Sequence, residues 1–214
     1  FYIIYIMFTL YSCTSKGANN GNDTPADSSA NKEKSAENTL KDDDIIKLYD
    51  FNINDLQKEQ NPKTARDIKL QRVGIADLKK IANSGSNTWM VVWASWCPHC
   101  REGLTHYPAT AKKVKGMEDL NMILIAEDYN LPVIQERLFE IGYKKQAYVL
   151  DPQEFGMDEE IKITNLRKYL CPTCPAVDAV VPQHYVFNKN GQIILNEVGG
   201  DISDIDIMTA IHSK

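Results

Sequence analysis

Four of the five cysteines form two pairs with two residues between the members of each pair. Cys97 and Cys100 lie in "VVWASWCPHCREG", and Cys171 and Cys174 lie in "CPTCP". Cysteines at this spacing form disulfides that exchange with other thiols, and two such pairs can also bind one zinc ion through four thiolates. The spacing therefore indicates either two redox pairs or one zinc site.

The residues before and after Cys97 favour redox chemistry. The apolar segment Trp89–Ala94 predicts a strand buried on both faces, and Pro98 suits the first turn of a helix. Cys97 would then lie at a helix N-terminus, where free N–H groups and the helix dipole favour an anion, so we expect it to ionise readily and act as the nucleophile. Cys100, one turn further on, would attack the mixed disulfide and release the substrate.

Three neighbours of the nucleophile are candidate site residues. Pro98 restricts the loop between the two cysteines, and a protonated His99 would add a positive field beside the thiolate. The alternative for His99 is a solvated loop residue with no role. Trp96 is expected to shape the site, whereas Trp89 and Trp93 are predicted to be core residues of the strand.

These residues require elements that hold them in place. Apolar patterning predicts alternating strands and helices, followed by a β-hairpin at "NKNG". This order implies an α/β fold with a central mixed sheet, helices on both faces and a C-terminal β-hairpin. We expect helices at 74–83, from Pro98 to about Val114, and at 132–141, 158–170 and 204–212, and strands at 89–94, 122–126, 147–150, 183–187 and 192–198.

The N-terminus predicts where the protein is located. Residues 1–12 contain an uncharged apolar run of signal-peptide length and end before Cys13 in "LYSC", which resembles a bacterial lipobox. We therefore expect a signal-peptide remnant, a lipid on Cys13, and a polar flexible linker over 13–44. A short buried helix that ends at a cysteine is the alternative. Residues 45–69 are interpreted as an N-terminal extension, and the whole as a lipid-anchored bacterial lipoprotein facing the oxidising periplasm.

Composition excludes several classes of function. The chain has 214 residues, of which 43% are hydrophobic, which predicts one medium-sized domain with extensions. Its formal net charge of -5 leaves no basic surface for counterion-driven binding, so nucleic acid is excluded as a partner. Neither a glycine-rich phosphate loop nor a Ser-His-Asp order is evident, and no cofactor is predicted.

Together these features resemble a known family. A buried strand that runs into "WCPHC", followed far downstream by Val-Pro before a strand and a hairpin, resembles the thioredoxin fold over residues 70–214. The tethered setting and "WASWCPHC" are similar to lipoprotein thiol-disulfide oxidoreductases of the TlpA and ResA type. The resemblance implies protein thiol or disulfide clients, a redox partner protein in the membrane or periplasm, and a cis Pro182 that faces the dithiol with Val181 as its partner. A trans proline that starts an edge strand is the alternative.

The chain departs from the family in its acids. Thioredoxin has a buried carboxylate where this chain has Val91, and many TlpA-type relatives have a glutamate where this chain has Gly103. The group that would take the proton of Cys100 is therefore unassigned. Glu102 and Glu127 are candidates, although a plain surface acid is the favoured interpretation of each.

The direction of electron flow and the second cysteine pair stay open. "CPHC" resembles DsbA-type oxidases, whereas the lipoprotein setting resembles reductants. Cys171 and Cys174 could form a disulfide that stiffens their loop, act as a second redox couple, or bind metal. Two functions remain as alternatives to the oxidoreductase: a four-cysteine zinc-binding or metal-delivery lipoprotein, and a non-catalytic thioredoxin-like binding module.

The other histidines lack the spacing of a metal site. His106, His184 and His212 are scattered along the chain. Each is interpreted as a surface or packing residue, and no metal ligand is assigned among them.

Overall fold

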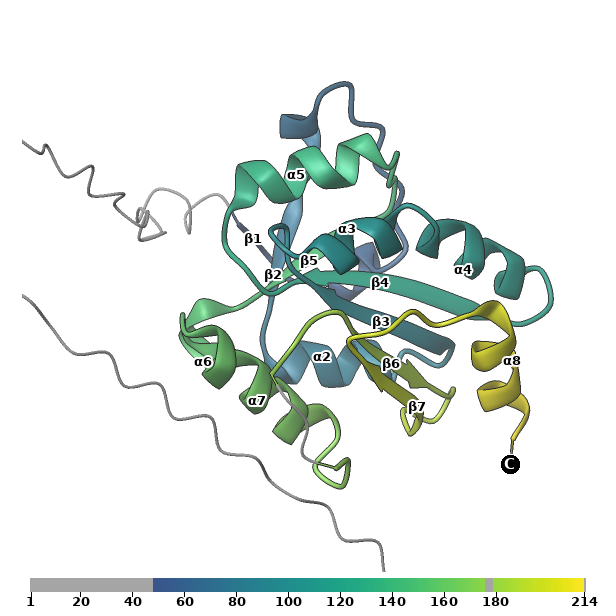
Figure 1. Cartoon of the computed structure of the whole chain (residues 1–214). Helices are drawn as coiled ribbons and strands as arrows, with labels where there is room; N and C mark the ends of the chain where they lie inside the picture. The colour runs from purple at the N-terminus through teal and green to yellow at the C-terminus, as the bar shows by residue number, and fades with distance from the viewer. Residues whose placement is uncertain (1–47, 176–178, 214) are drawn as a thin grey trace, which may run out of the picture. The chain divides into compact units, whose positions relative to one another are not determined.

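The computed structural model describes residues 48–175 and 179–213 (Figure 1). The predicted signal-peptide remnant, Cys13 and the linker lie outside these residues. Within the described part of the chain, no helix combines the length and the apolar character needed to cross a membrane.

One sheet runs through the described residues, with strand order β1-β2-β5-β4-β3-β6-β7. The first five strands in this order are parallel to their neighbours, and β6 and β7 are antiparallel. The strands are β1 (Tyr49–Asp50), β2 (Leu70–Val73), β3 (Asn87–Trp93), β4 (Leu120–Ala126), β5 (Ala147–Leu150), β6 (Gln183–Phe187) and β7 (Ile193–Val198).

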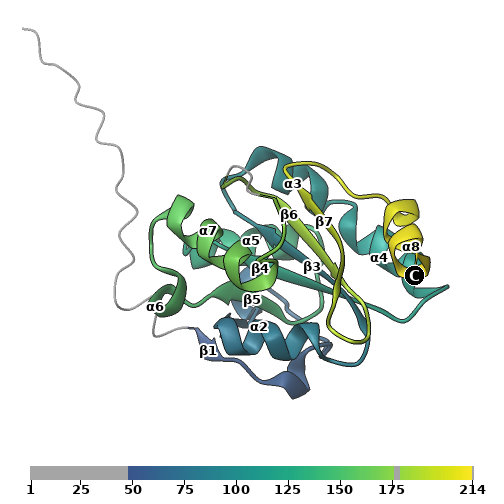
Figure 2. The same ribbon diagram turned by 90° about the horizontal axis from the view of Figure 1, so that it is seen from below.

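Helices cover both faces of this sheet (Figures 1 and 2). Side chains alternate along β3, so that Trp89, Val91 and Trp93 pack on one face and Met90 and Val92 on the other. The first face is covered by α3 (Pro98–Leu104), α4 (Tyr107–Lys115), α5 (Leu131–Glu140) and α8 (Asp204–His212), and the second by α2 (Ile75–Ala82), α6 (Pro152–Phe155) and α7 (Glu159–Leu170). The predicted thioredoxin-like α/β class, with a mixed sheet between helices and a C-terminal hairpin, is confirmed.

The prediction of one helix from Pro98 to about Val114 is wrong. The chain forms α3 and α4 with a break at Thr105 and His106, where the backbone makes tight bonds to residues three positions back, at 3.1 and 3.0 Å. Pro108 explains the break, because it has no N–H to continue the helical ladder and is favoured only in the first turn of a new helix. The break gives α3 and α4 different directions (Figure 1).

The predicted extension contributes to the sheet where it is described. β1 pairs in parallel with β2, and two short 3-10 helices, η1 (Ile53–Asp55) and η2 (Ala65–Asp67), connect them. The sequence predicted none of β1, β2, η1, η2 or α6. Each has only two to four residues, which is too short to show a periodic pattern.

Candidate dithiol site

Three loops meet at one edge of the sheet and form the site. β3 and β4 are parallel, and both end at this edge, with Trp93 opposite Ala126. β6 is antiparallel to β3 and begins there, with Gln183 opposite Val92. The residues after β3, after β4 and before β6 are therefore brought together, although they are far apart in the sequence.

Cys97 is the N-cap residue of α3 and lies 3% exposed at this edge. Its sulfur accepts a hydrogen bond from the backbone N of Cys100 at 3.1 Å and donates to the backbone oxygen of Val181 at 3.5 Å. The Val181–Pro182 peptide bond is cis. The structure thus brings Cys97 together with Cys100 and the Val-Pro pair named from the sequence.

Cys100 lies behind Cys97 and is fully buried. Burial is the main cause that raises the pKa of the Cys100 thiol, and the neighbouring Cys97 and the negative charge of Glu127 raise it further. Cys100 is therefore held as a thiol, and it needs a proton acceptor before it can attack a disulfide.

The other three named neighbours face solvent. Trp96 is 52% exposed, next to Cys97 in the chain, and Pro98 and His99 are exposed in the first turn of α3. Trp89 and Trp93 are buried in the core, as predicted. The site thus has a buried sulfur pair and an exposed aromatic residue beside it.

Asp128 supports the loop before Cys97, and sequence reasoning missed it. Its buried carboxylate accepts hydrogen bonds from the backbone N of Ser95 at 2.6 Å, from the Ser95 hydroxyl at 2.9 Å and from the backbone N of Asn130 at 3.1 Å. Only the contact with Asn130 has a local signal in the sequence, because an aspartate often accepts a hydrogen bond from the backbone N two residues further on. The contacts with Ser95 join the β3 and β4 loops.

The two acids proposed as proton acceptors differ in burial. Glu102 is exposed on α3, in agreement with a surface acid. For Glu127 the surface interpretation is wrong, because the residue is 1% exposed and its Oε2 lies 2.8 Å from Nζ of a buried Lys162. Burial raises the pKa of Glu127 to about 7, although Lys162 opposes this shift.

Lys162 was also missed, although the sequence contains a signal for it. The residue lies on α7 beside Ile163 and Leu166, and all three are buried. A lysine within the apolar face of a predicted helix is uncommon and indicates a buried partner of opposite charge. That partner comes from another element, so the helix alone could not identify it.

A cluster of aromatic and histidine side chains lies beneath α3. His184 is buried. Its Nδ1 accepts a hydrogen bond from Trp89 Nε1 at 3.3 Å, and its Nε2 lies 3.4 Å from the Tyr107 hydroxyl. Burial lowers the pKa of His184 to about 4, so the ring is neutral at pH 7. Tyr107 lies against Gly103, where an added Cβ would collide with its hydroxyl. His184 is thus a packing histidine, as predicted.

The second cysteine pair is a disulfide at the C-terminal end of α7. Cys171 and Cys174 are bonded to each other, with Cα atoms 5.3 Å apart. They pack on the α7 face of the sheet, whereas Cys97 and Cys100 pack on the α3 face. The four cysteine sulfurs are therefore not gathered at one point. In the described residues no three His, Cys, Asp or Glu side chains are placed to hold a metal.

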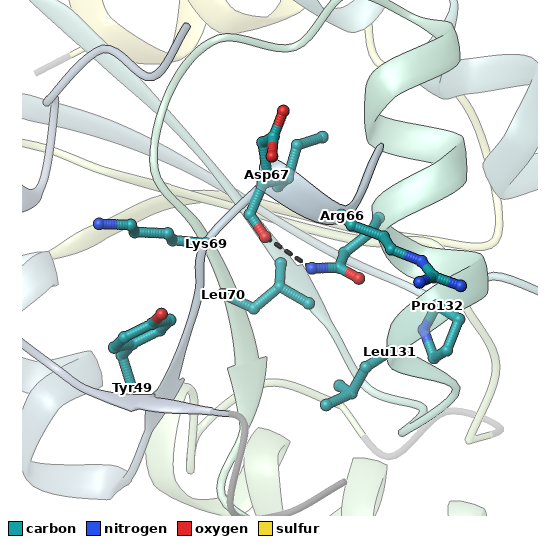
Figure 3. A pocket seen from close by; sticks show the side chains of 9 residues that line it. Tyr49, Arg66, Asp67, Lys69, Leu70, Leu131 and Pro132 are labelled. Atoms are coloured by element: carbon teal, nitrogen blue, oxygen red, sulfur yellow. Dashed lines mark hydrogen bonds between the residues drawn. The ribbon is translucent and has the colours of Figure 1, made fainter. Parts of the chain in front are cut away.

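One cavity in the described residues lies away from the dithiol. Its volume is about 750 Å³, and Figure 3 shows it between η2, β2 and the start of α5. Gln135 of α5 is one of the residues that line it and donates through Nε2 to the backbone oxygen of Ile68 at 2.7 Å. None of the site residues named above lines it. The lining residues are Tyr49, Arg66, Asp67, Ile68, Lys69, Leu70, Leu131, Pro132 and Gln135.

No protein-family model matches this chain, and no curated protein is significantly similar to it in sequence. Several solved structures resemble it. The thioredoxin domain of a thiol-disulfide oxidoreductase from Bacteroides vulgatus is 16% identical with a TM-score of 0.43, covering 58% of this chain and 77% of its own. A putative thiol:disulfide interchange protein DsbE from Chlorobium tepidum is 19% identical with a TM-score of 0.44, covering 60% of this chain and 82% of its own. StoA from Bacillus subtilis is 16% identical with a TM-score of 0.41, covering 59% of this chain and 82% of its own. Likeness at this level carries no argument about activity, which has to come from the chain's own residues.

Proposed function

We propose that this protein is a thiol-disulfide oxidoreductase that exchanges disulfides with protein clients outside the cytoplasm through Cys97 and Cys100. The observation that carries the proposal is the position of the Cys97 sulfur. It lies at the start of α3 within 3.1 Å of the Cys100 backbone N and 3.5 Å of the Val181 oxygen. A sulfur that accepts an N–H hydrogen bond at the start of a helix and lies beside the Val181 oxygen is placed to attack a disulfide that arrives at this edge.

The reaction proceeds in two steps with balanced electrons. The Cys97 thiolate attacks one sulfur of a client disulfide, forms a mixed disulfide, and releases the other client sulfur as a thiolate. The Cys100 sulfur then attacks Cys97, so the Cys97–Cys100 bond forms and the client leaves as a dithiol. The client gains two electrons, and the protein loses two. The same steps in reverse oxidise a client dithiol.

Exposed apolar residues on both sides of Cys97 support protein clients. Trp96 precedes Cys97 and is 52% exposed, and Val180 is 43% exposed beside Val181. Large exposed apolar side chains around a reactive group favour contact with a polypeptide. A redox partner protein in the membrane or periplasm would use the same edge to restore the dithiol or the disulfide.

The test is to trap the client. A Cys100→Ser variant keeps the nucleophile but lacks the resolving sulfur, so it should accumulate mixed disulfides with a peptide that contains a disulfide. Mass spectrometry would locate the bond at Cys97, and Cys97→Ser is the control that should trap nothing. A reactive Cys97 would separate the oxidoreductase from the non-catalytic binding module. If Cys97 of the Cys100→Ser variant stays unmodified, the proposal is wrong.

The proposed location rests on the N-terminal sequence. A lipid on Cys13 and the polar residues up to 44 would hold the domain near a bacterial membrane, facing the periplasm. Labelling with a fatty acid in a bacterial host should mark the wild-type protein and spare a Cys13→Ser variant. Equal labelling of both would contradict the anchor.

For the second pair, the proposed role is structural. Cys171 is 8% exposed and packs with Cys174 against the core on the α7 face, where a disulfide braces the end of the helix. The redox-couple alternative predicts that replacing this pair changes the reduction potential of Cys97 and Cys100. The structural role predicts an unchanged potential.

A further inference from the structure

A buried glutamine lies directly behind the loop that meets Cys97. Gln183 is the first residue of β6 and is paired with Val92 of β3 on one side and Val198 of β7 on the other. The residue is fully buried, which is uncommon for glutamine and requires hydrogen-bond partners for its amide. Because strands on both sides fix its backbone, a group that its side chain holds is fixed relative to the sheet.

The Gln183 amide has a partner at each end. Its Nε2 donates to the backbone oxygen of Val180 at 3.0 Å, and its Oε1 accepts from the Tyr185 hydroxyl. A backbone oxygen can only accept, so it requires the NH₂ end of the amide, and the oxygen end is left for the hydroxyl of Tyr185. The side chain therefore has one orientation that satisfies both contacts.

The hydrogen bond to Val180 lies one residue away from the contact with the dithiol. The Val181 oxygen is 3.5 Å from the Cys97 sulfur, and Val180 directly precedes Val181. The Val180 side chain is 43% exposed, so the segment that Gln183 holds is also one that an approaching polypeptide meets. Gln183 does not touch the sulfur and acts on its surroundings through the loop.

The loop is also held on the other side of the Val181 oxygen. The backbone N of Gly199 donates to the oxygen of Pro182 at 2.8 Å. An added Cβ on Gly199 would lie 3.6 Å from the Val180 side chain, so the two residues are neighbours. Of these two hydrogen bonds to the loop, that of Gln183 comes from a side chain and can be removed by substitution.

We propose that Gln183 is a positioning residue for polypeptide clients, because it keeps Val180 and Val181 in the conformation that a client chain meets on its way to Cys97. A client that passes Val180 binds better to a segment that is already ordered, since ordering it on binding would cost free energy. A small disulfide needs only the sulfur and gains nothing from this order. The inference rests on the proposed dithiol exchange and adds a preference for polypeptide disulfides over small ones.

The variant Gln183→Met tests this role, because methionine has a similar length and offers no donor to the Val180 oxygen. The second-order rate constant of the reduced protein with a peptide disulfide should fall by about 5–10-fold, which corresponds to the loss of about one hydrogen bond. The rate constant with a small aromatic disulfide should keep its wild-type value. Gln153→Met, at an exposed position of α6, is the matched control and should keep both rate constants.

Equal losses with the two substrates, or no loss with the peptide, would overturn the inference. If the wild type reacts with neither substrate, the proposed function fails and the inference fails with it. If the wild type reacts with both and Gln183→Met keeps its rate with the peptide, only the inference fails.

A second variant separates position from stability. Gln183→Met leaves the Tyr185 hydroxyl without its acceptor, and adding Tyr185→Phe removes that unsatisfied group. The double variant should unfold at a higher urea concentration than Gln183→Met and keep the low rate constant with the peptide. A rate constant that recovers together with stability would overturn the inference.

A measurement that leaves Gln183 in place covers the case in which Gln183→Met does not fold. In the Cys100→Ser variant, Cys97 would be joined either to a peptide or to a small aromatic thiol. The NMR signals of the Gln183 side-chain amide should differ between the two adducts, because only the peptide passes Val180, and those of Gln153 should not. Identical Gln183 signals in both adducts would contradict the inference.

Discussion

The buried Glu127 carboxyl makes the stability of the fold depend on pH. Its folded-state pKa of about 7 lies above the ordinary 4.5, so the folded protein binds this proton more tightly than the unfolded chain does. The stability from this group is therefore fully present below 4.5 and is lost as the pH rises through about 7. At about 1.4 kcal/mol for each pH unit between the two values, the loss is about 3 kcal/mol.

Glu127→Gln removes the titrating group and so isolates its contribution. The free energy of unfolding of oxidised wild type and variant would be measured by urea denaturation across the interval from 4.5 to about 7. As the pH rises over this interval, the free energy of unfolding of the wild type should fall by about 3 kcal/mol relative to that of the variant, and the difference should then become constant. Other groups that titrate in both proteins cancel in the difference. A difference that stays constant across the interval would refute the reasoning, and the exposed Glu102→Gln should give such a constant difference.

Three further changes have defined outcomes. Gly103→Ala places a methyl group against the Tyr107 hydroxyl and should lower the free energy of unfolding by about 1–3 kcal/mol in thermal denaturation. Gly200→Ala, where an added Cβ meets nothing within 4 Å, should lower it much less, and equal losses would contradict the contact. Tyr107→Phe keeps the ring and removes the hydrogen bonds of the hydroxyl, so we expect a loss of about 1 kcal/mol in urea denaturation, and no loss would mean that these bonds contribute nothing net. Replacing both Cys171 and Cys174 by serine should lower the free energy of unfolding by about 2 kcal/mol on the chain-entropy model and leave the reduction potential of Cys97 and Cys100 unchanged. A changed potential would favour the second redox couple.

The fold could be predicted from local patterns because its longer elements are periodic or continuously apolar. The strand at Trp89–Ala94, the helix over Asp204–His212 and the hairpin at "NKNG" were all recognisable within windows of about ten residues. The break between α3 and α4 is not apparent from composition, because the residues on both sides favour a helix and only the missing N–H of Pro108 marks it.

The sequence by itself identified the candidate dithiol, since Cys97 and Cys100 need only their spacing and a helix start to be recognised. The tertiary structure decided what surrounds them. Val181 meets Cys97 across 84 positions of the chain, and Glu127 meets Lys162 across 35. Such contacts depend on which strands are neighbours and which face of α7 is buried, and neither is encoded in a local period. A glutamate after a strand looks the same in sequence whether it is solvated or buried, so only the packing of α7 could show that this one is a buried carboxylate paired with Lys162.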